Sequence, residues 1–201
     1  MYLVLNIFLN HPKISFLDYL DFEEKSEQKH EYHNGKLRIM PGGTSTHNKI
    51  GANISRIVGN ALIEKDKDCD VYSSDMKISN ATLQSALYPD LTVVCGDTEY
   101  FVVGRKDVIA NPTVLFEVIS PSTGTYDYSG KFSLYKTFTS LRQYVLIEQD
   151  TPYIEVRTLE NIEKNSWTFE TYEDMDAIVE LKSIGISLPL KEIYRRVKFE
   201  E

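Results

Sequence analysis

Two acidic side chains stand where a carboxylate can do chemistry. Glu117 lies inside the apolar run 113–119, which is typical of a buried central strand, where an unpaired carboxylate is costly. Asp90 follows Pro89 at the start of an earlier strand-like run, 91–95. Hard divalent cations prefer carboxylate oxygens, so we hypothesise that both side chains bind Mg²⁺, with Mn²⁺ as a substitute. The alternatives are turn chemistry for Asp90 and an Arg or Lys partner, or an exposed edge, for Glu117.

Two lysines compete for a role beside this pair of carboxylates. Lys131 falls on a predicted helix, 127–138, where Asp127, Lys131 and Tyr135 share one face. An ordinary helical ion pair between Asp127 and Lys131 explains the spacing equally well. Lys77 alternates with apolar neighbours on a predicted strand, so its side chain also reaches a sheet face. Either lysine would stabilise negative charge on a phosphate or orient an attacking water.

Two further residues are weaker candidates for a supporting role. Glu31 precedes the Asn34-Gly35 turn of a predicted hairpin at 29–40. His47 lies in the first turn of a predicted helix, on the face that carries Ile50 and Ile54. A histidine in such a place is more often a hydrogen-bonded structural residue than a ligand.

The composition indicates a protein with a core of ordinary size. The chain has 201 residues, 42% of them hydrophobic, and we expect a leader segment at 1–14 and a single domain at 15–201. The formal net charge of −8 argues against indiscriminate coating of nucleic acid. Charge is nevertheless segregated, because residues 29–56 hold five Lys or Arg against Glu31 alone.

The expected location follows from what the sequence lacks. Cys69 and Cys95 show no metal-binding spacing, so we expect both to be reduced and to pack as small hydrophobes. Neither a signal peptide nor a membrane-spanning run is recognisable. We therefore expect a cytoplasmic protein.

The hydrophobic patterns predict helices and strands in a mixed order. Helices are expected from Ser15 to Phe22, after a cap at Ser45 or Thr46, at 127–138, and in a last turn at 190–194. Besides the hairpin at 29–40, strands are expected at 71–72, 75–78, 88–95, 113–119, 142–148, 153–158, 167–172 and 179–181. The fold class is therefore α/β in the sense of an α+β mixed sheet: a central sheet flanked by helices, with an antiparallel C-terminal extension.

Several stretches together resemble the Uma family of restriction endonuclease-like proteins, within the PD-(D/E)XK nuclease superfamily. They are Pro89-Asp90, 117–123, Tyr126-Asp127, Lys131, Tyr135 and 144–148, with 30–35, 41–44 and His47 upstream. The resemblance covers residues 15–196. It implies a restriction-endonuclease-like core, with Asp90 and Glu117 as Mg²⁺ ligands. Ile119 stands where the superfamily places its lysine, and Lys131 matches the position to which similar proteins move it. Glu31 matches a glutamate that supports the metal in related nucleases.

The favoured function is a Mg²⁺-dependent DNA endonuclease in which Asp90, Glu117 and Lys131 are catalytic, supported by Glu31, His47, Asp127 and Lys77. A homodimer formed through the C-terminal strands would suit cleavage of both strands of a duplex. A catalytically silent module of the same fold, binding nucleic acid or a protein, is the alternative. An enzyme acting on another phosphate-containing substrate is a third, broader hypothesis.

Overall fold

The fold is described here from a computed structural model, for residues 13–120, 124 and 126–199. Most of the expected leader segment, and residues 121–123 of the Ser-Pro-Ser-Thr stretch, lie outside these described residues. A mixed sheet of six strands forms the centre, in the order β11-β10-β9-β8-β6-β3. Its strands are β3 (Cys69–Ser73), β6 (Leu91–Cys95), β8 (Val114–Ile119), β9 (Gln143–Glu148), β10 (Ile154–Asn161) and β11 (Ser166–Tyr172). Within this sheet only β8 and β9 pair in parallel, and the other neighbours are antiparallel.

Strand β8 is buried over its whole length and divides the core in two. Val114, Phe116 and Val118 face one layer, whereas Leu115 and Ile119 face the other. Because side chains alternate along a strand, Glu117 points into the same layer as Leu115 and Ile119. The position of Glu117 is therefore set by the period of two in an apolar strand.

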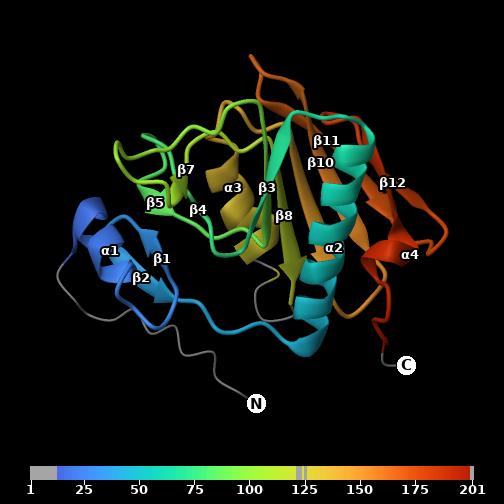
Figure 1. The fold of residues 1–201 in the computed structure, drawn as a ribbon, viewed down its shortest axis with the longest axis horizontal. Helices are drawn as coiled ribbons and strands as arrows, with labels where there is room; N and C mark the ends of the chain where they lie inside the picture. Colours follow the sequence, from blue (N-terminus) through green and yellow to red (C-terminus); the bar gives the residue numbers. More distant parts are fainter. Residues whose placement is uncertain (1–12, 121–123, 125, 200–201) are drawn as a thin grey trace.

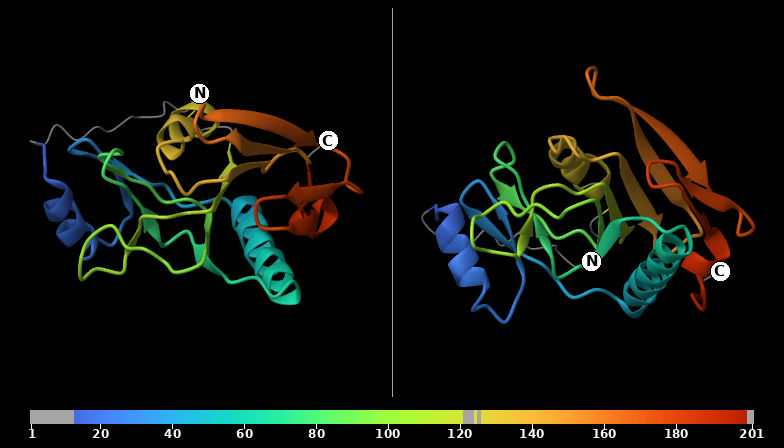
Figure 2. Two further views of the ribbon diagram at one scale, coloured as in Figure 1. Left: turned by 90° about the horizontal axis from the view of Figure 1, so that it is seen from above. Right: turned by 45° about the horizontal axis from the view of Figure 1, so that its top comes forward.

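Helices and small strands cover both faces of the sheet. The long helix α2 (Ser45–Glu64) packs on the Val114 face, together with β12 (Ile178–Leu181), β13 (Ile186–Pro189) and the short helix α4 (Leu190–Ile193). The other face carries η1 (Tyr126–Lys131), a π-helical turn, and α3 (Phe132–Tyr135), which continues it. Figure 2 shows α2 and α3 on opposite sides of the sheet. Glu117 therefore points toward η1 and α3.

A third, smaller cluster lies beside the sheet. It consists of α1 (Phe16–Glu23) and the hairpin β1 (His30–His33) and β2 (Lys36–Ile39), with short strands β4 (Lys77–Ile78), β5 (Ser85–Ala86) and β7 (Val108–Ile109) nearby. Figure 1 shows α1 and the hairpin grouped at one end of the molecule. Asn34 and Gly35 both have positive φ, as the predicted two-residue turn requires.

Most expected elements are confirmed, with several corrections. Thr44, rather than Ser45 or Thr46, caps α2: its hydroxyl accepts the His47 N–H at 3.1 Å. The expected helix at 127–138 is η1 followed by α3, which ends at Tyr135. Strands β5, β7 and β13 are additional to those predicted.

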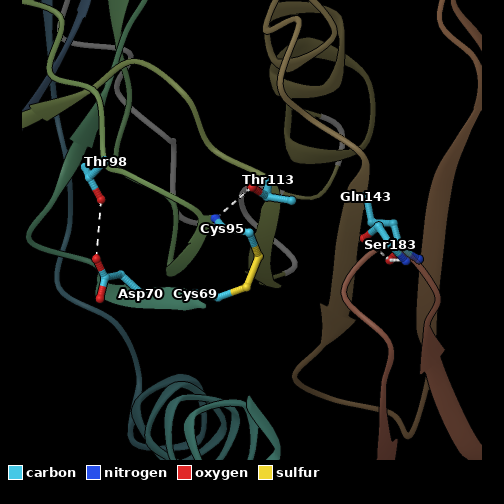
Figure 3. The surroundings of a disulfide bond; sticks show 7 residues. All are labelled: Cys69, Asp70, Cys95, Thr98, Thr113, Gln143 and Ser183. Carbon is cyan, nitrogen blue, oxygen red and sulfur yellow. Dashed lines mark hydrogen bonds between the residues drawn. A yellow bond between two sulfur atoms is a disulfide. The ribbon is translucent and has the colours of Figure 1, made fainter. Parts of the chain in front are cut away.

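The expectation that the two cysteines are free is wrong. Cys69 and Cys95 face each other across β3 and β6 and form a disulfide (Figure 3). The Cys95 N–H also donates to Thr113 Oγ1 at 3.0 Å, which holds this corner of the sheet. The register sets the two half-buried cysteines directly opposite each other, where their sulfur atoms can bond. No sequence motif reveals this pairing.

Among the helices of the described residues, none has the length and apolar character that crossing a bilayer requires.

Candidate active site

Glu117 is the buried centre of a polar cluster inside an otherwise apolar layer. Its Oε1 accepts hydrogen bonds from Lys131 Nζ at 3.0 Å and from the Tyr135 hydroxyl at 2.5 Å. Both donors come from the turn of helix that follows β8, four residues apart, so they meet the same oxygen. Both of these bonds go to Oε1, and none to Oε2 is found among the described residues.

Asp90 completes the pair from the start of β6. Its Oδ2 accepts the Val118 N–H at 2.7 Å, so the residue next to Glu117 fixes the orientation of the second carboxylate. His47 Nε2 lies 3.3 Å from the same oxygen. Burial lowers the pKa of His47, but the hydrogen bond and charge of Asp90 outweigh it, so that the pKa is raised overall.

Lys131 joins three carboxylates. Its Nζ lies 3.0 Å from Glu117, 3.4 Å from Glu31 and 3.5 Å from Asp127. Burial lowers the pKa of Lys131, but these carboxylates outweigh it and raise the pKa well above its ordinary value. The helical ion pair with Asp127 and the contact with Glu117 therefore coexist, and the ammonium is a fixed positive charge.

Glu31 enters the cluster from the hairpin. It lies on strand β1, and its Oε1 is buried and accepts no hydrogen bond within the described residues. Burial raises the pKa of Glu31, but Lys131, His33 and Arg38 outweigh it and lower the pKa to about 2. Glu31 is therefore ionised at neutral pH and lies 3.4 Å from Lys131 Nζ.

Negative charge exceeds positive charge at the centre of this cluster. Burial raises the pKa of Glu117 well above its ordinary value, and Asp90 and Asp127 add to that rise, while Lys131 and Tyr135 only partly oppose it. A further cation beside Glu117 would lower this pKa again. The surroundings of Glu117 thus disfavour its ionised form.

The donor set fits one hard cation held by few protein ligands. No group of three or more His, Cys, Asp or Glu side chains in the described residues has the arrangement of a metal site. Mg²⁺ is usually bound by one or two carboxylates and takes its remaining oxygens from water and substrate phosphate. Asp90 and Glu117 are two carboxylates that could supply such ligands, one fixed by the Val118 N–H and the other by Lys131 and Tyr135.

The structure separates the two competing lysines. Lys77 is buried on β4, 3.2 Å from Asp107 and with its Nζ 5.4 Å from the centre of the Tyr88 ring. It makes no ion pair with Asp90 or Glu117 in the described chain. Lys131, and not Lys77, is therefore the lysine that meets Glu117.

Four residues of the cluster were not among the site residues predicted from sequence: His33, Arg38, Tyr126 and Tyr135. Glu31 Oε2 lies 3.3 Å from His33 Nε2 and 3.4 Å from the Tyr126 hydroxyl. The Arg38 guanidinium carbon lies over the Tyr126 ring, 4.3 Å from its centre. A signal for Arg38 did exist, because a two-residue turn at Asn34-Gly35 fixes Arg38 directly opposite Glu31.

Comparisons with known proteins confirm the expected family and fold. The model of the Uma2 family, described as "Putative restriction endonuclease", matches residues 16–191. The uncharacterized proteins slr1290 and sll1609 of Synechocystis sp. (strain ATCC 27184 / PCC 6803 / Kazusa) are 35% and 31% identical to this chain. The alignments cover 94% and 66% of this chain, and 95% and 73% of those proteins. A crystal structure of a "putative nuclease belonging to DUF820" from Anabaena variabilis ATCC 29413 has a TM-score of 0.71 at 16% identity. It covers 90% of this chain and 97% of that one, which shows a shared fold.

Proposed function

This chain belongs to the Uma2 family of restriction endonuclease-like proteins, and from that premise we propose that it is a Mg²⁺-dependent DNA endonuclease that hydrolyses phosphodiester bonds. One observation carries the proposal: the ammonium of Lys131 lies 3.0 Å from the buried carboxylate of Glu117, and Asp90 is fixed beside it through the Val118 N–H. Two carboxylates and a lysine are the inventory of a metal-assisted phosphodiesterase.

Each residue has a distinct task in this mechanism. Asp90 and Glu117 would hold Mg²⁺, which when bound supplies Lewis-acid polarisation of a phosphate oxygen. Lys131 stays charged because of its raised pKa, so it acts as a positive charge and not as a base. It orients the attacking water and stabilises the negative charge that develops on the phosphate, as the water oxygen bonds to phosphorus and the ester P–O bond breaks.

The supporting residues fix this geometry. Tyr135 and Lys131 share Glu117 Oε1, so neither the carboxylate nor the ammonium can rotate freely. His47, in the first turn of α2, holds Asp90. The Thr44 hydroxyl donates to Gln149 Oε1 at 2.8 Å and so fixes the start of α2 to the end of β9. Glu31 and Asp127 complete the surroundings of the ammonium.

The test is cleavage of supercoiled and linear DNA with Mg²⁺ or Mn²⁺, comparing wild type with Glu117→Gln, Asp90→Asn and Lys131→Met. We expect metal-dependent cutting to fall at least about 100-fold in each variant, because each loses a charge that acts in the transition state. Lys77→Met is the matched control, since it removes a buried, ion-paired lysine outside the cluster and should leave the rate of cutting unchanged in the folded protein.

The outcomes separate the hypotheses. Lys131→Met leaves buried carboxylates without their cationic partner, so the fold of this variant must be checked by circular dichroism. Asp90 is less buried, so Asp90→Asn tests the role of the carboxylates independently of this effect. Cutting by all three variants at the wild-type rate would refute the mechanism. Absence of cutting by wild type on every DNA form would favour the catalytically silent module.

A further inference from the structure

One face of the β1–β2 hairpin points at the cluster, and it carries basic side chains. The register pairs Glu31 with Arg38 and His33 with Lys36, so these four residues share a face. The opposite face carries Tyr32 and Leu37, which pack with α1. The hairpin is thus anchored through its apolar face and presents Arg38 beside the same carboxylate that faces Lys131.

Arg38 is held in place while much of its hydrogen-bonding capacity remains unused. Its guanidinium lies 4.3 Å from the centre of the Tyr126 ring, and its Nη1 is 3.7 Å from Glu31 Oε2. These are its only ion pair and ring contact in the described residues, although a guanidinium has five N–H donors. The side chain is 34% exposed, whereas that of Lys131 is 6% exposed.

The charges alternate from the centre of the site to its surface. Glu117, Lys131, Glu31 and Arg38 follow one another, each in contact with the next. Arg38 is the exposed end of this series, and the Glu31 carboxylate lies between it and Lys131. Arg38 belongs to the basic segment 29–56 of a chain with a formal charge of −8, so it supplies positive charge at the more exposed end of the cluster.

We infer that Arg38, stacked on Tyr126, is a binding subsite for a backbone phosphate of a DNA strand next to the phosphate that is cleaved. The inference rests on the proposed function, and it makes a polynucleotide the substrate, because the subsite needs a second phosphate. A guanidinium stacked on a ring keeps its edge free and preoriented for two phosphate oxygens, which a lysine cannot match. Contacts of this kind fix the position of the strand without reading its sequence.

The experiment is DNA binding without catalysis. Fluorescence anisotropy of a labelled 20-base-pair duplex in EDTA would be recorded from 20 to 200 mM NaCl for wild type, Arg38→Gln, Arg38→Lys and Arg56→Gln. We expect Arg38→Gln to bind about tenfold more weakly and to lower the salt slope by about 0.9, the value of one lost phosphate contact. Arg38→Lys should keep most of the slope and lose part of the affinity.

Arg56→Gln is the control, because Arg56 is an exposed arginine paired with Glu192 of α4 at 3.3 Å, outside the cluster. It should change neither affinity nor slope. Glu31 keeps Lys131 and His33 as partners in Arg38→Gln, so that variant should fold. As a second variant, Tyr126→Leu removes the stacking ring without changing the charge, and we expect weaker binding with most of the slope retained.

The outcomes distinguish this inference from the proposed function. Equal slopes for wild type and Arg38→Gln, with Mg²⁺-dependent cutting intact, would overturn the subsite and leave the nuclease standing. A reduced slope in Arg38→Gln without any cutting by wild type would support the subsite and count against the nuclease. Failure of wild type to bind the duplex at 20 mM NaCl would overturn both.

Discussion

At the scale of single residues, Tyr135 illustrates how a neutral group can control a charged one. Burial and the nearby Glu117 raise the pKa of Tyr135 well above its ordinary value, so the hydroxyl stays protonated and donates. We expect Tyr135→Phe to lower kcat/KM for DNA cleavage by about 10- to 100-fold, because Glu117 Oε1 loses one of the two donors that fix its position. It should also lower the free energy of unfolding by about 1.5–3 kcal/mol, measured in urea.

Tyr194→Phe is the matched control for this prediction. Tyr194 is equally buried, and its hydroxyl lies 2.9 Å from the carbonyl oxygens of Glu148 and Tyr153. Loss of that hydroxyl should cost about 1 kcal/mol of stability and leave kcat/KM unchanged. Equal losses of activity in the two variants would show that Tyr135 acts through general stability and not through Glu117.

Residue types and spacing were enough to predict part of this site. The buried strand singled out Glu117, and the helical repeat placed Asp127, Lys131 and Tyr135 on one face, where Lys131 and Tyr135 do meet Glu117. The choice between Lys131 and Lys77 could not be made from sequence. It depends on Asp107, which lies 30 residues beyond Lys77 and reaches its Nζ only through the tertiary fold.

At the scale of elements, η1 shapes the region between Arg38 and Lys131. Gly130 lies against the Tyr126 ring, and a Cβ at this position would be 2.7 Å from Tyr126 Cδ2. The ring cannot give way without disturbing the stack with Arg38. We expect Gly130→Ala to lower the free energy of unfolding by about 1–3 kcal/mol, as overpacking does, measured by urea denaturation.

Gly59→Ala gives the comparison for that prediction. Gly59 lies inside α2, and a Cβ there would meet nothing within 4 Å. Alanine should therefore raise stability by up to about 1 kcal/mol through its helix propensity. Stabilisation by both substitutions would mean that Tyr126 moves freely and does not form a fixed platform.

Sequence patterns predict long elements better than special ones. Asn34-Gly35 predicted the hairpin and therefore its register, and six apolar positions with helical spacing predicted α2. The π-helical form of η1 has no comparable sequence signal, because the apolar spacing predicts a helix without distinguishing its type. Strand β13 has only four residues, and it is defined by its pairing with β12 more than by its own pattern.

At the scale of the whole molecule, the sheet brings together residues that are distant in sequence. Cys69 and Cys95 have no motif in common, and only the antiparallel register of β3 and β6 sets them opposite each other. The same sheet places Asp90 at the start of β6 beside Val118 of β8. Local patterns could predict neither contact, and the sequence predicted only that Asp90 and Glu117 share a metal site.

The disulfide should stabilise the whole fold without acting on the site. It links positions 26 residues apart, and closing a loop of that size in the unfolded chain contributes about 3 kcal/mol. Reduction with dithiothreitol should therefore lower the free energy of unfolding by about that amount. Cleavage well below the melting temperature should be unchanged, because Cys95 ends β6 and Asp90 precedes its first residue. The double variant Cys69→Ser, Cys95→Ser should have the stability of the reduced protein, and the reductant should not change it. Equal melting temperatures of wild type with and without reductant would mean that the two thiols stay unbonded in solution.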